Sequence, residues 1–362
     1  MRRLDEGRVM ATLPHVAERA GVSTATAARA LGGYGSVRAS TRERVLAAAE
    51  GLGYRANGLA RSMITGSTQT IGVLMSDIEN PFFRRSLRGV ADTARSRGFE
   101  VLLANTDEEL AVEQTAVSLL AERRVDGMVV CPADPGDRQH LAAVIESGIP
   151  IVLLDRKMTG LPADVVGIDN RKAGRQATQR LLDAGHRRIA ILTGAEPDLG
   201  ERLRRPGMKG VERLSATTTG SRAAGYRDAL VTVGLEPRPE YLSTNGFRRE
   251  DAVEATHLLM SLPEPPTAIL AFDAMQSLGA LRAFAELGLR CPDDVSLLGF
   301  DDAEWADVVS PQLSVLAQPV YEIGVQACEL LLSRIAGDTR RPSHHRLATQ
   351  LLERASIGPP PA

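Results

Sequence analysis

Cysteine and long apolar runs are scarce in this sequence. The three cysteines, Cys131, Cys291 and Cys328, have neither paired nor metal-ligand spacing. This scarcity argues against a disulfide framework or a structural zinc site and fits a reducing cytosol. The amino terminus has no apolar core of signal-peptide length, and no later stretch is long enough to span a bilayer. We therefore expect a cytoplasmic protein without a membrane partner.

Motifs of common catalytic sites are also absent. The sequence contains no GxxxxGK[ST] phosphate loop, GxSxG elbow, HExxH pair or dinucleotide fingerprint. The six histidines are scattered, and the pair His344 and His345 is more typical of a solvated tail than of a metal site. Asp301 and Asp302 are adjacent on an expected strand, so they point in opposite directions and make a poor catalytic dyad. We expect no enzymatic activity, cofactor or metal.

Length and charge indicate more than one domain. A chain of 362 residues is too long for one compact core, so two or three domains are expected. The net charge of −2 hides an asymmetry, because residues 1–62 contain ten arginines against five acidic residues and the remainder carries −7. A basic end on an acidic body favours a polyanionic partner at that end, and a solvated basic face is the alternative.

The segment that begins at Thr12 predicts two short helices joined by a tight turn. Three small apolar residues share one helical face: Val16, Ala17 and Ala20. Gly21 suits the turn, and Ser23 can cap the second helix. Two short helices and a glycine turn are the helix-turn-helix plan, although a generic helical bundle has the same pattern.

From Thr70 onward, apolar runs alternate with helical stretches. The first series extends to IPIVLLD at 149–155, and a second begins at RRIAILTG, residues 187–194. This repeated strand-helix order predicts an α/β fold with two doubly wound parallel sheets and a ligand cleft at the carboxyl ends of the strands. The architecture leaves function open, because many enzymes share it.

Specific motifs in both regions are similar to those of the lactose/galactose repressor family of bacterial transcription regulators. In the amino-terminal region they are AGVS at 20–23, TRERV at 41–45 and LGYRAN at 52–57. In the body they include DIENPFF at 77–83, GIDN at 167–170, GHRRIAILTG at 185–194 and PDDVSLLGFDD at 292–302. The resemblance extends from Thr12 to about Ile357. It implies a helix-turn-helix domain, a hinge and a sensor like the periplasmic sugar-binding proteins.

The resemblance also implies domain boundaries. They are an amino-terminal extension at 1–11, a DNA-binding domain at 12–57, a hinge at 58–69, a first sensor subdomain at 70–168 and 303–336, and a second at 169–302 and 337–358. The segment 196–220 is inserted where the family has a short loop. A cleft lid and an anion-binding element are possible roles for it, and we expect a disordered surface loop.

The resemblance assigns DNA contacts to the second helix, the end of the domain and the hinge. It places Thr24, Ala25 and Arg29 at base edges, where an arginine can read guanine with two hydrogen bonds. Phosphate contacts are expected from Ser23, Thr26, Tyr54 and Asn57, for which capping or packing is the alternative. In the hinge, Arg61 and Met63 would contact DNA, with Met63 in the minor groove, unless the segment is a plain linker.

The resemblance places the effector site in the cleft. The expected contacts are polar or aromatic side chains at strand ends and on one helix: Asn80, Phe82, Asp155, Arg156, Asp169, Arg222, Phe247, Asp273, Asp301 and Gln318. Carboxylates suit vicinal hydroxyls and an arginine can clamp two oxygens, so a sugar or sugar phosphate is the expected effector. Alternatively, Asp155 only orients Arg156 and Asp301 only caps its strand.

Together these expectations describe a homodimeric repressor of carbohydrate-metabolism genes that binds a palindromic operator and responds to a small effector. Two alternatives share the sensor architecture. An exported sugar-binding protein would need a signal sequence and no DNA-binding domain, and a sugar-processing enzyme would need a catalytic constellation that the sequence lacks.

Overall fold

The computed structural model describes residues 11–32, 35–54, 67–194, 199–204, 217–244, 246 and 248–361. Four expected contact residues therefore lie outside the described part of the chain: Asn57, Arg61, Met63 and Phe247. The chain divides into two compact units. One comprises residues 1–70 with Arg124–Asp126, and the other comprises the rest.

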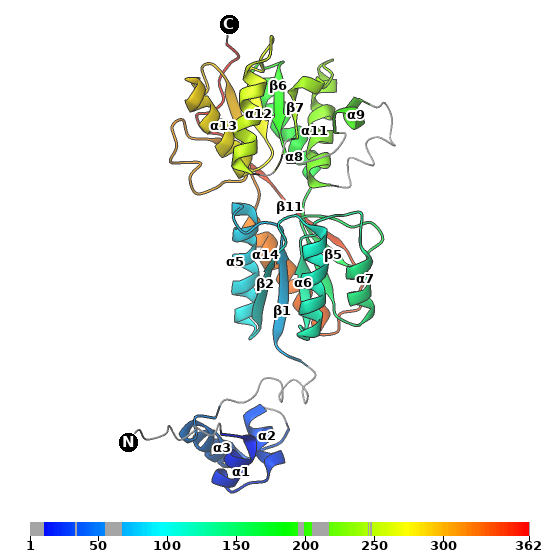
Figure 1. The fold of residues 1–362 in the computed structure, drawn as a ribbon, viewed down its shortest axis with the longest axis vertical. Coiled ribbons are helices and arrows are strands. Elements are labelled where there is room, and N and C mark those ends of the chain that lie inside the picture. Colours follow the sequence, from blue (N-terminus) through cyan, green and yellow to red (C-terminus); the bar gives the residue numbers. More distant parts are fainter. Residues whose placement is uncertain are drawn as a thin grey trace, which may run out of the picture. The chain divides into compact units, whose positions relative to one another are not determined.

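The first unit contains three helices that enclose a small core (Figure 1). They are α1 (Leu13–Ala20), α2 (Thr24–Gly32) and α3 (Ala39–Gly51). The core is built mainly from alanine and valine: Val16, Ala17, Ala20, Ala27, Ala30, Val45, Ala48 and Ala49. Gly21 ends α1 with a left-handed φ of 62°, which glycine adopts without strain. The predicted helix-turn-helix is confirmed.

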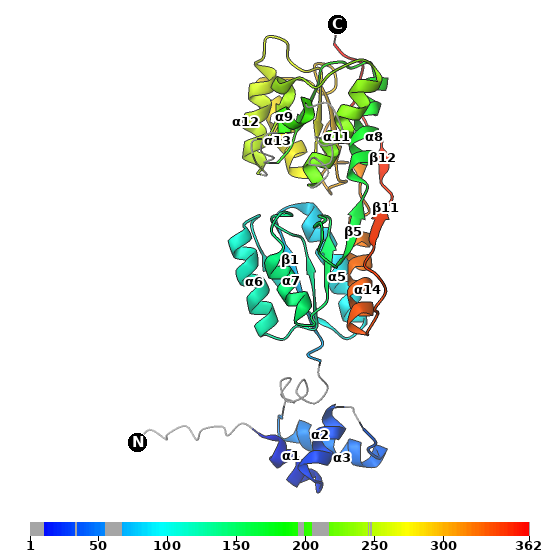
Figure 2. The same ribbon diagram turned by 90° about the vertical axis from the view of Figure 1, so that its right-hand side faces the viewer.

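The second unit begins with a six-stranded sheet of order β11-β5-β4-β3-β1-β2. Its strands are β1 (Thr70–Met75), β2 (Glu100–Asn105), β3 (Gly127–Val130), β4 (Ile151–Leu154), β5 (Asp164–Ile168) and β11 (His344–Leu347). Helices α5 (Pro81–Ser96) and α14 (Val320–Ile335) pack on one face, and α6 (Leu110–Glu122) and α7 (Gln139–Glu146) pack on the other (Figure 2). The pairs β1-β3, β3-β4 and β4-β5 are parallel, as predicted, and β5 also pairs in parallel with β11.

A second six-stranded sheet has the order β12-β10-β9-β8-β6-β7. Its strands are β6 (Ile189–Leu192), β7 (Leu242–Ser243), β8 (Ala268–Ala271), β9 (Ser296–Phe300), β10 (Ser314–Ala317) and the antiparallel β12 (Gln350–Leu352). Helices α8 (Asn170–Asp183) and α11 (Thr218–Thr232) pair on one face, and α12 (Arg249–Met260) and α13 (Ala274–Leu287) pair on the other.

The chain crosses between the sheets after β5, after β10 and between β11 and β12. Figure 2 shows β5, β11 and β12 along one side of the two subdomains. The predicted subdomain boundaries are wrong at two points. β10 lies in the second sheet beside β9, and β11 lies in the first sheet beside β5. Residues 303–317 thus belong with the second sheet and 337–347 with the first.

The expectation of a surface loop at 196–220 is wrong for its described residues. Helix α9 (Leu199–Arg204) contacts α11, and its Leu199 and Leu203 are buried in the core. At the other end, the Thr217 side chain caps α11 by accepting from Gly220 N at 2.9 Å. These two ends are part of the folded second subdomain.

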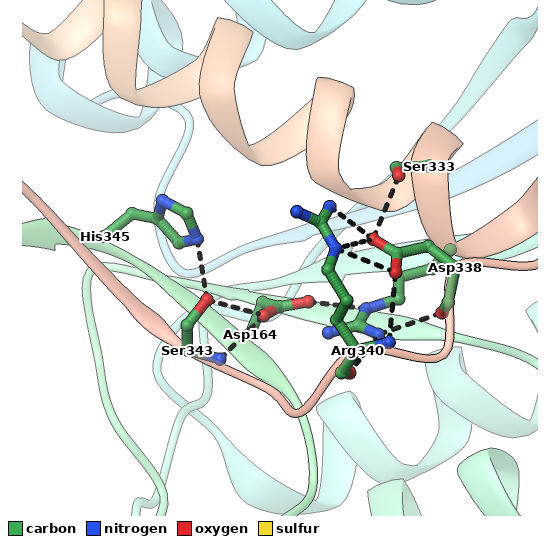
Figure 3. A network of polar contacts seen from close by, with 7 residues as sticks. Asp164, Ser333, Asp338, Arg340, Ser343 and His345 are labelled. Carbon is green, nitrogen blue, oxygen red and sulfur yellow. Dashed lines mark hydrogen bonds and ion pairs between the residues drawn. The ribbon is translucent and has the colours of Figure 1, made fainter.

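A buried carboxylate anchors β11 to the first sheet (Figure 3). Asp164 on β5 is 1% exposed, and it accepts hydrogen bonds from Arg334 Nε on α14 at 2.7 Å and from Ser343 N at 2.8 Å. Burial raises the pKa of Asp164, but the hydrogen bonds from Arg334 and Ser343 outweigh burial and hold the pKa below its ordinary value. The network fixes the segment that leads into β11 at the start of β5, away from the carboxyl ends of the strands.

Candidate functional site: a DNA-reading helix and an acidic cavity

Helix α2 presents small polar side chains to solvent. Ser23, Thr24, Ala25 and Arg29 are exposed and Thr26 is half-buried. Ser23 Oγ accepts from Thr26 N at 3.2 Å, which confirms the predicted cap. Arg29 lies one turn after Ala25 and donates from Nε to the Ala25 carbonyl at 3.2 Å, so these two residues share one face of α2. Tyr54 packs partly against the core of the unit.

The two consecutive alanines of α2, Ala27 and Ala28, differ in burial. Ala27 is fully buried between the three helices of a core made largely of alanine, so its methyl group packs where a larger side chain would not fit without a shift. Ala28 is half-buried.

In the second unit, a cavity of about 860 Å³ lies between the carboxyl ends of the two sets of strands. Eight of the ten expected effector residues line it: Asn80, Phe82, Asp155, Arg156, Arg222, Asp273, Asp301 and Gln318. Its size is within the range of small-molecule sites. Parallel strands bring these residues together because their carboxyl ends meet at one edge of each sheet.

Two aspartates occupy equivalent positions on the two sheets. Asp155 follows β4 and Asp301 follows β9, and both adopt left-handed backbones with φ of 65° and 67°. Each donates its backbone N–H to the next strand, Asp155 to the Val166 carbonyl at 2.7 Å and Asp301 to the Leu316 carbonyl at 3.1 Å. A left-handed aspartate costs about 1 kcal/mol, and such strain is common at binding sites. The arrangement turns both residues into the cavity wall.

Arg222 on α11 is the inner cation of the cavity. It is 6% exposed, donates from Nε to Asn170 Oδ1 at 2.8 Å and from Nη1 to the Phe272 carbonyl, and stacks 4.2 Å from the Phe300 ring centroid. Its position depends on a close helix crossing, because a Cβ added at Gly174 of α8 would lie 2.1 Å from the Arg222 carbonyl oxygen. The guanidinium is thus held rigidly before any ligand arrives.

Asp301 is buried beside Arg222 and accepts from Gln318 Nε2 at 2.7 Å. Burial raises its pKa to about 6, and nearby Asp273 and Asp155 add to the rise, although Arg222 and Gln318 oppose it. Burial also raises the pKa of Asp273. The inner wall therefore holds more negative charge than Arg222 balances.

Other expected residues are held by local structure as well as lining the cavity. Asn80 caps α5 by accepting from Phe82 N at 2.9 Å, and Asp273 caps α13 by accepting from Gln276 N at 2.8 Å. Phe82 packs edge to face on Phe83, with ring centroids 5.2 Å apart. These contacts fix the positions of the side chains and leave their roles toward a ligand as predictions.

Arg156 is already paired within the protein. Its Nη1 and Nη2 groups donate to the two carboxylate oxygens of Glu108, the latter at 2.6 Å, and Nη1 also donates to the Pro132 carbonyl at 2.9 Å. The alternative that Asp155 only orients Arg156 has no support in these contacts. Because these donors of the Arg156 guanidinium are already paired, it has little capacity left to bind an anion.

Asp169 is the expected residue that the structure places elsewhere. It is not among the residues that line the cavity, and its carboxylate caps α8 by accepting from Lys172 N at 3.0 Å, with Arg346 of β11 at 3.5 Å. Its neighbour Asn170, which the sequence did not single out, holds Arg222 instead. Thr218 was also missed, and its Oγ1 donates to Asp155 Oδ2 at 3.1 Å.

Neither a membrane-spanning helix nor a metal-binding cluster was found in the part of the chain that the structure describes. None of its helices is long and apolar enough to cross a bilayer. No group of three or more His, Cys, Asp or Glu side chains among the described residues is suited to hold a metal ion.

A helix-turn-helix unit and a two-sheet body with a cavity at its strand ends define a DNA-binding regulator with a ligand sensor. Comparison with known families agrees. Residues 12–57 match the family described as "Bacterial regulatory proteins, lacI family", and residues 178–357 match the "Periplasmic binding protein-like domain".

Individual proteins are similar over almost the whole chain. The HTH-type transcriptional repressor CytR of Escherichia coli (strain K12) is 32% identical over 349 residues, 96% of this chain and 96% of that protein. The structure of transcriptional regulator CelR with cellobiose is 31% identical with a TM-score of 0.68, covering 96% of this chain and 99% of that one. The Lac repressor dimer bound to operator and the anti-inducer ONPF is 26% identical with a TM-score of 0.80, at the same coverage.

The chain belongs to the lacI family of bacterial regulatory proteins. It is a DNA-binding transcription regulator of the repressor kind and not an enzyme. The expected family, fold and regulatory function are confirmed.

Proposed function

We propose that this chain is a cytoplasmic, homodimeric repressor that is released from a palindromic operator, or recruited to it, by a small polyhydroxyl effector such as a sugar. The observation that carries the proposal is the cavity between the sheets, which is lined by Asp155 of the first subdomain and by Asp301 and Arg222 of the second. A ligand that bridges the two aspartates stabilises one relative arrangement of the subdomains. Differential affinity for two arrangements is what an effector needs in order to shift an equilibrium.

The charge of the cavity argues against a sugar phosphate. Its described lining contains ten carboxylates and four guanidiniums. Two of the guanidiniums are neutralised within the lining, Arg156 by Glu108 and Arg249 by Glu250. A dianionic phosphate would be repelled by this surplus of negative charge. Of the two expected effectors, we therefore retain the sugar and not the sugar phosphate. The cellobiose bound by CelR supports a sugar.

Dimerisation is supported by the edge of the first sheet. β2 is the edge strand, and its Leu102 and Leu103 are exposed although a strand of this composition is usually covered. A palindromic operator also requires two symmetrically placed recognition helices. The Lac repressor dimer, at 26% identity, is an example of that arrangement.

The DNA contacts stay predictions and can be tested by substitution. We expect Arg29→Ala to lose discrimination at one base pair of each half-site by about 1–3 kcal/mol, because a bidentate guanine contact is lost. Arg44→Ala, which removes an exposed arginine from α3, is the matched control and should weaken all DNA binding equally. The measurement is selection of bound duplexes from a random pool by each protein.

Recovery of a palindromic site by the wild-type chain, with one degenerate position for Arg29→Ala, would support the proposal. A wild-type selection without any consensus would contradict sequence-specific binding. An exported sugar-binding protein would select no DNA consensus. A sugar-processing enzyme would instead turn over a sugar during incubation.

A further inference from the structure

The inner wall of the cavity has buried hydrogen-bond acceptors that lack donors. Asp155 Oδ1 and Gln318 Oε1 are both inaccessible to solvent and have no partner among the described residues. Gln318 is 8% exposed, and its amide orientation is set because Nε2 donates to Asp301. The part of the Gln318 amide that is left without a partner is therefore its carbonyl oxygen. An unpaired buried acceptor costs about 1–3 kcal/mol, which a ligand with matching donors would recover.

The same wall lacks positive charge. Asp301 lies near enough to both Asp155 and Asp273 to interact with them, and Arg222 is the cation that opposes Asp273 and Asp301. Arg156 contributes nothing to the balance, because Glu108 pairs with it through both carboxylate oxygens. Three carboxylates against one guanidinium leave a local deficit of two positive charges. Bringing such charges out of water is costly unless an opposite charge accompanies them.

A neutral hydroxyl group satisfies an acceptor but does not change this balance. A protonated primary amine provides three donors, no acceptor and one positive charge, so it can pair with the unsatisfied acceptors and reduce the charge deficit by one. We propose that the effector is a polyhydroxyl molecule with a protonated amino group, which binds between Asp155, Asp301 and Gln318. This inference rests on the proposed function of the cavity as the effector site.

The remaining lining suits the body of such a ligand. Thr193 Oγ1 is buried without a partner in the described part of the chain and can pair with a ligand hydroxyl. Phe82 and Phe272 supply apolar surface on which a sugar ring can pack. An amino sugar combines the two kinds of group.

The test is calorimetric titration of the full chain with D-glucosamine, D-galactosamine and D-mannosamine. Each is compared with its neutral parent sugar, which has a hydroxyl in place of the amine, and with its N-acetyl derivative, which keeps the nitrogen, removes the charge and adds an acetyl group. We expect at least one amino sugar to bind about tenfold or more tightly than both of its uncharged counterparts. Equal or tighter binding of the uncharged sugars, or no binding of any amino sugar at millimolar concentration, would overturn the proposal.

Two isosteric variants locate the charge. Asp155→Asn and Asp301→Asn should each reduce the preference for the amine to about threefold or less, because each removes one carboxylate from the wall. Asp302→Asn is the matched control, since Asp302 pairs with Arg354 at 2.7 Å outside the cavity lining. Asp302→Asn should keep the wild-type preference for the amine. If it loses as much preference as Asp155→Asn and Asp301→Asn do, the assigned position of the amine is contradicted.

Operator binding by the same wild-type preparation separates this inference from the proposed function. If an uncharged sugar releases the protein from the operator or recruits it there, the proposed regulatory function stands and the proposed amino group of the effector is refuted. Absence of any sequence-specific DNA binding would refute the regulator itself, whatever the sugars do.

Discussion

Replacing Asp301 by asparagine should stabilise the ligand-free protein at neutral pH. Burial raises the pKa of Asp301 from 3.8 to about 6, so the ionised form is less favourable in the folded state than in the unfolded state. A shift of this size corresponds to about 3 kcal/mol, at roughly 1.4 kcal/mol per pH unit. Asparagine has the same shape, can still accept from Gln318, and tolerates the left-handed backbone. The change removes the cost of the buried charge.

The sign of this effect depends on pH. Below about pH 4 the carboxyl is protonated in both states, so wild type and Asp301→Asn should be equally stable. As the pH rises through the interval from about 4 to 6, the wild type loses stability from this group and the variant does not. Above about pH 6 the difference should be constant, on the order of 2–3 kcal/mol in favour of the variant.

Urea unfolding across this pH range provides the measurement. The single tryptophan, Trp305, packs against the core of the second subdomain and reports on the subdomain that contains Asp301. Asp302→Asn, which loses a partly exposed pair with Arg354, should change stability by about 1 kcal/mol or less. No gain for Asp301→Asn at neutral pH, or the same gain at about pH 4, would refute the reasoning.

Two further predictions concern positioning and stability. Gly174→Ala should destabilise the second subdomain by about 1–3 kcal/mol and weaken effector binding, because its Cβ would overlap the Arg222 carbonyl and displace α11. Urea unfolding measures the loss of stability, and calorimetry measures the effector affinity. An unchanged affinity would show that the helix crossing does not position Arg222. Asp164→Asn should cost about 2 kcal/mol near neutral pH, because the half-buried Arg334 loses its charged partner. Because the pKa of Asp164 is lowered in the folded state, the stability that its carboxylate contributes should be complete above about pH 4 and lost as the pH falls through the folded pKa. A variant as stable as the wild type at neutral pH would contradict the assigned role.

Much of the site follows from the position of polar residues after apolar strands. Asp155 and Asp301 follow β4 and β9, where the family resemblance places effector contacts, and both line the cavity because the carboxyl ends of parallel strands meet at one edge. Asp169 shows the limit of this reasoning. It is adjacent to Asn170 at the start of α8, and successive helical residues differ by about 100° in direction. One position caps the helix and the next holds Arg222, which the motif alone does not distinguish.

Contacts between residues far apart in the chain could not be predicted from the sequence, for a different reason. Glu108 neutralises Arg156 across 48 positions of chain, so the available charge of the cavity cannot be counted from its motifs. The same holds for the crossing strands. β10 and β11 are short, and their composition does not reveal which sheet accepts their backbone hydrogen bonds. Leu199 and Leu203 lie in a segment with little periodicity and are buried because α11 offers them an apolar face.

The most direct test of the account is operator binding measured against effector concentration for three proteins. These are the wild type, Arg222→Ala, and Arg171→Ala as the control, because Arg171 is an exposed arginine of α8 that pairs with Asp228 away from the cavity lining. All three should have the same operator affinity without ligand, and the ligand should change that affinity for the wild type and Arg171→Ala but not for Arg222→Ala. An unchanged response in Arg222→Ala, or a wild type that binds ligand in the cavity without any change in operator affinity, would contradict the claim that this cavity controls DNA binding.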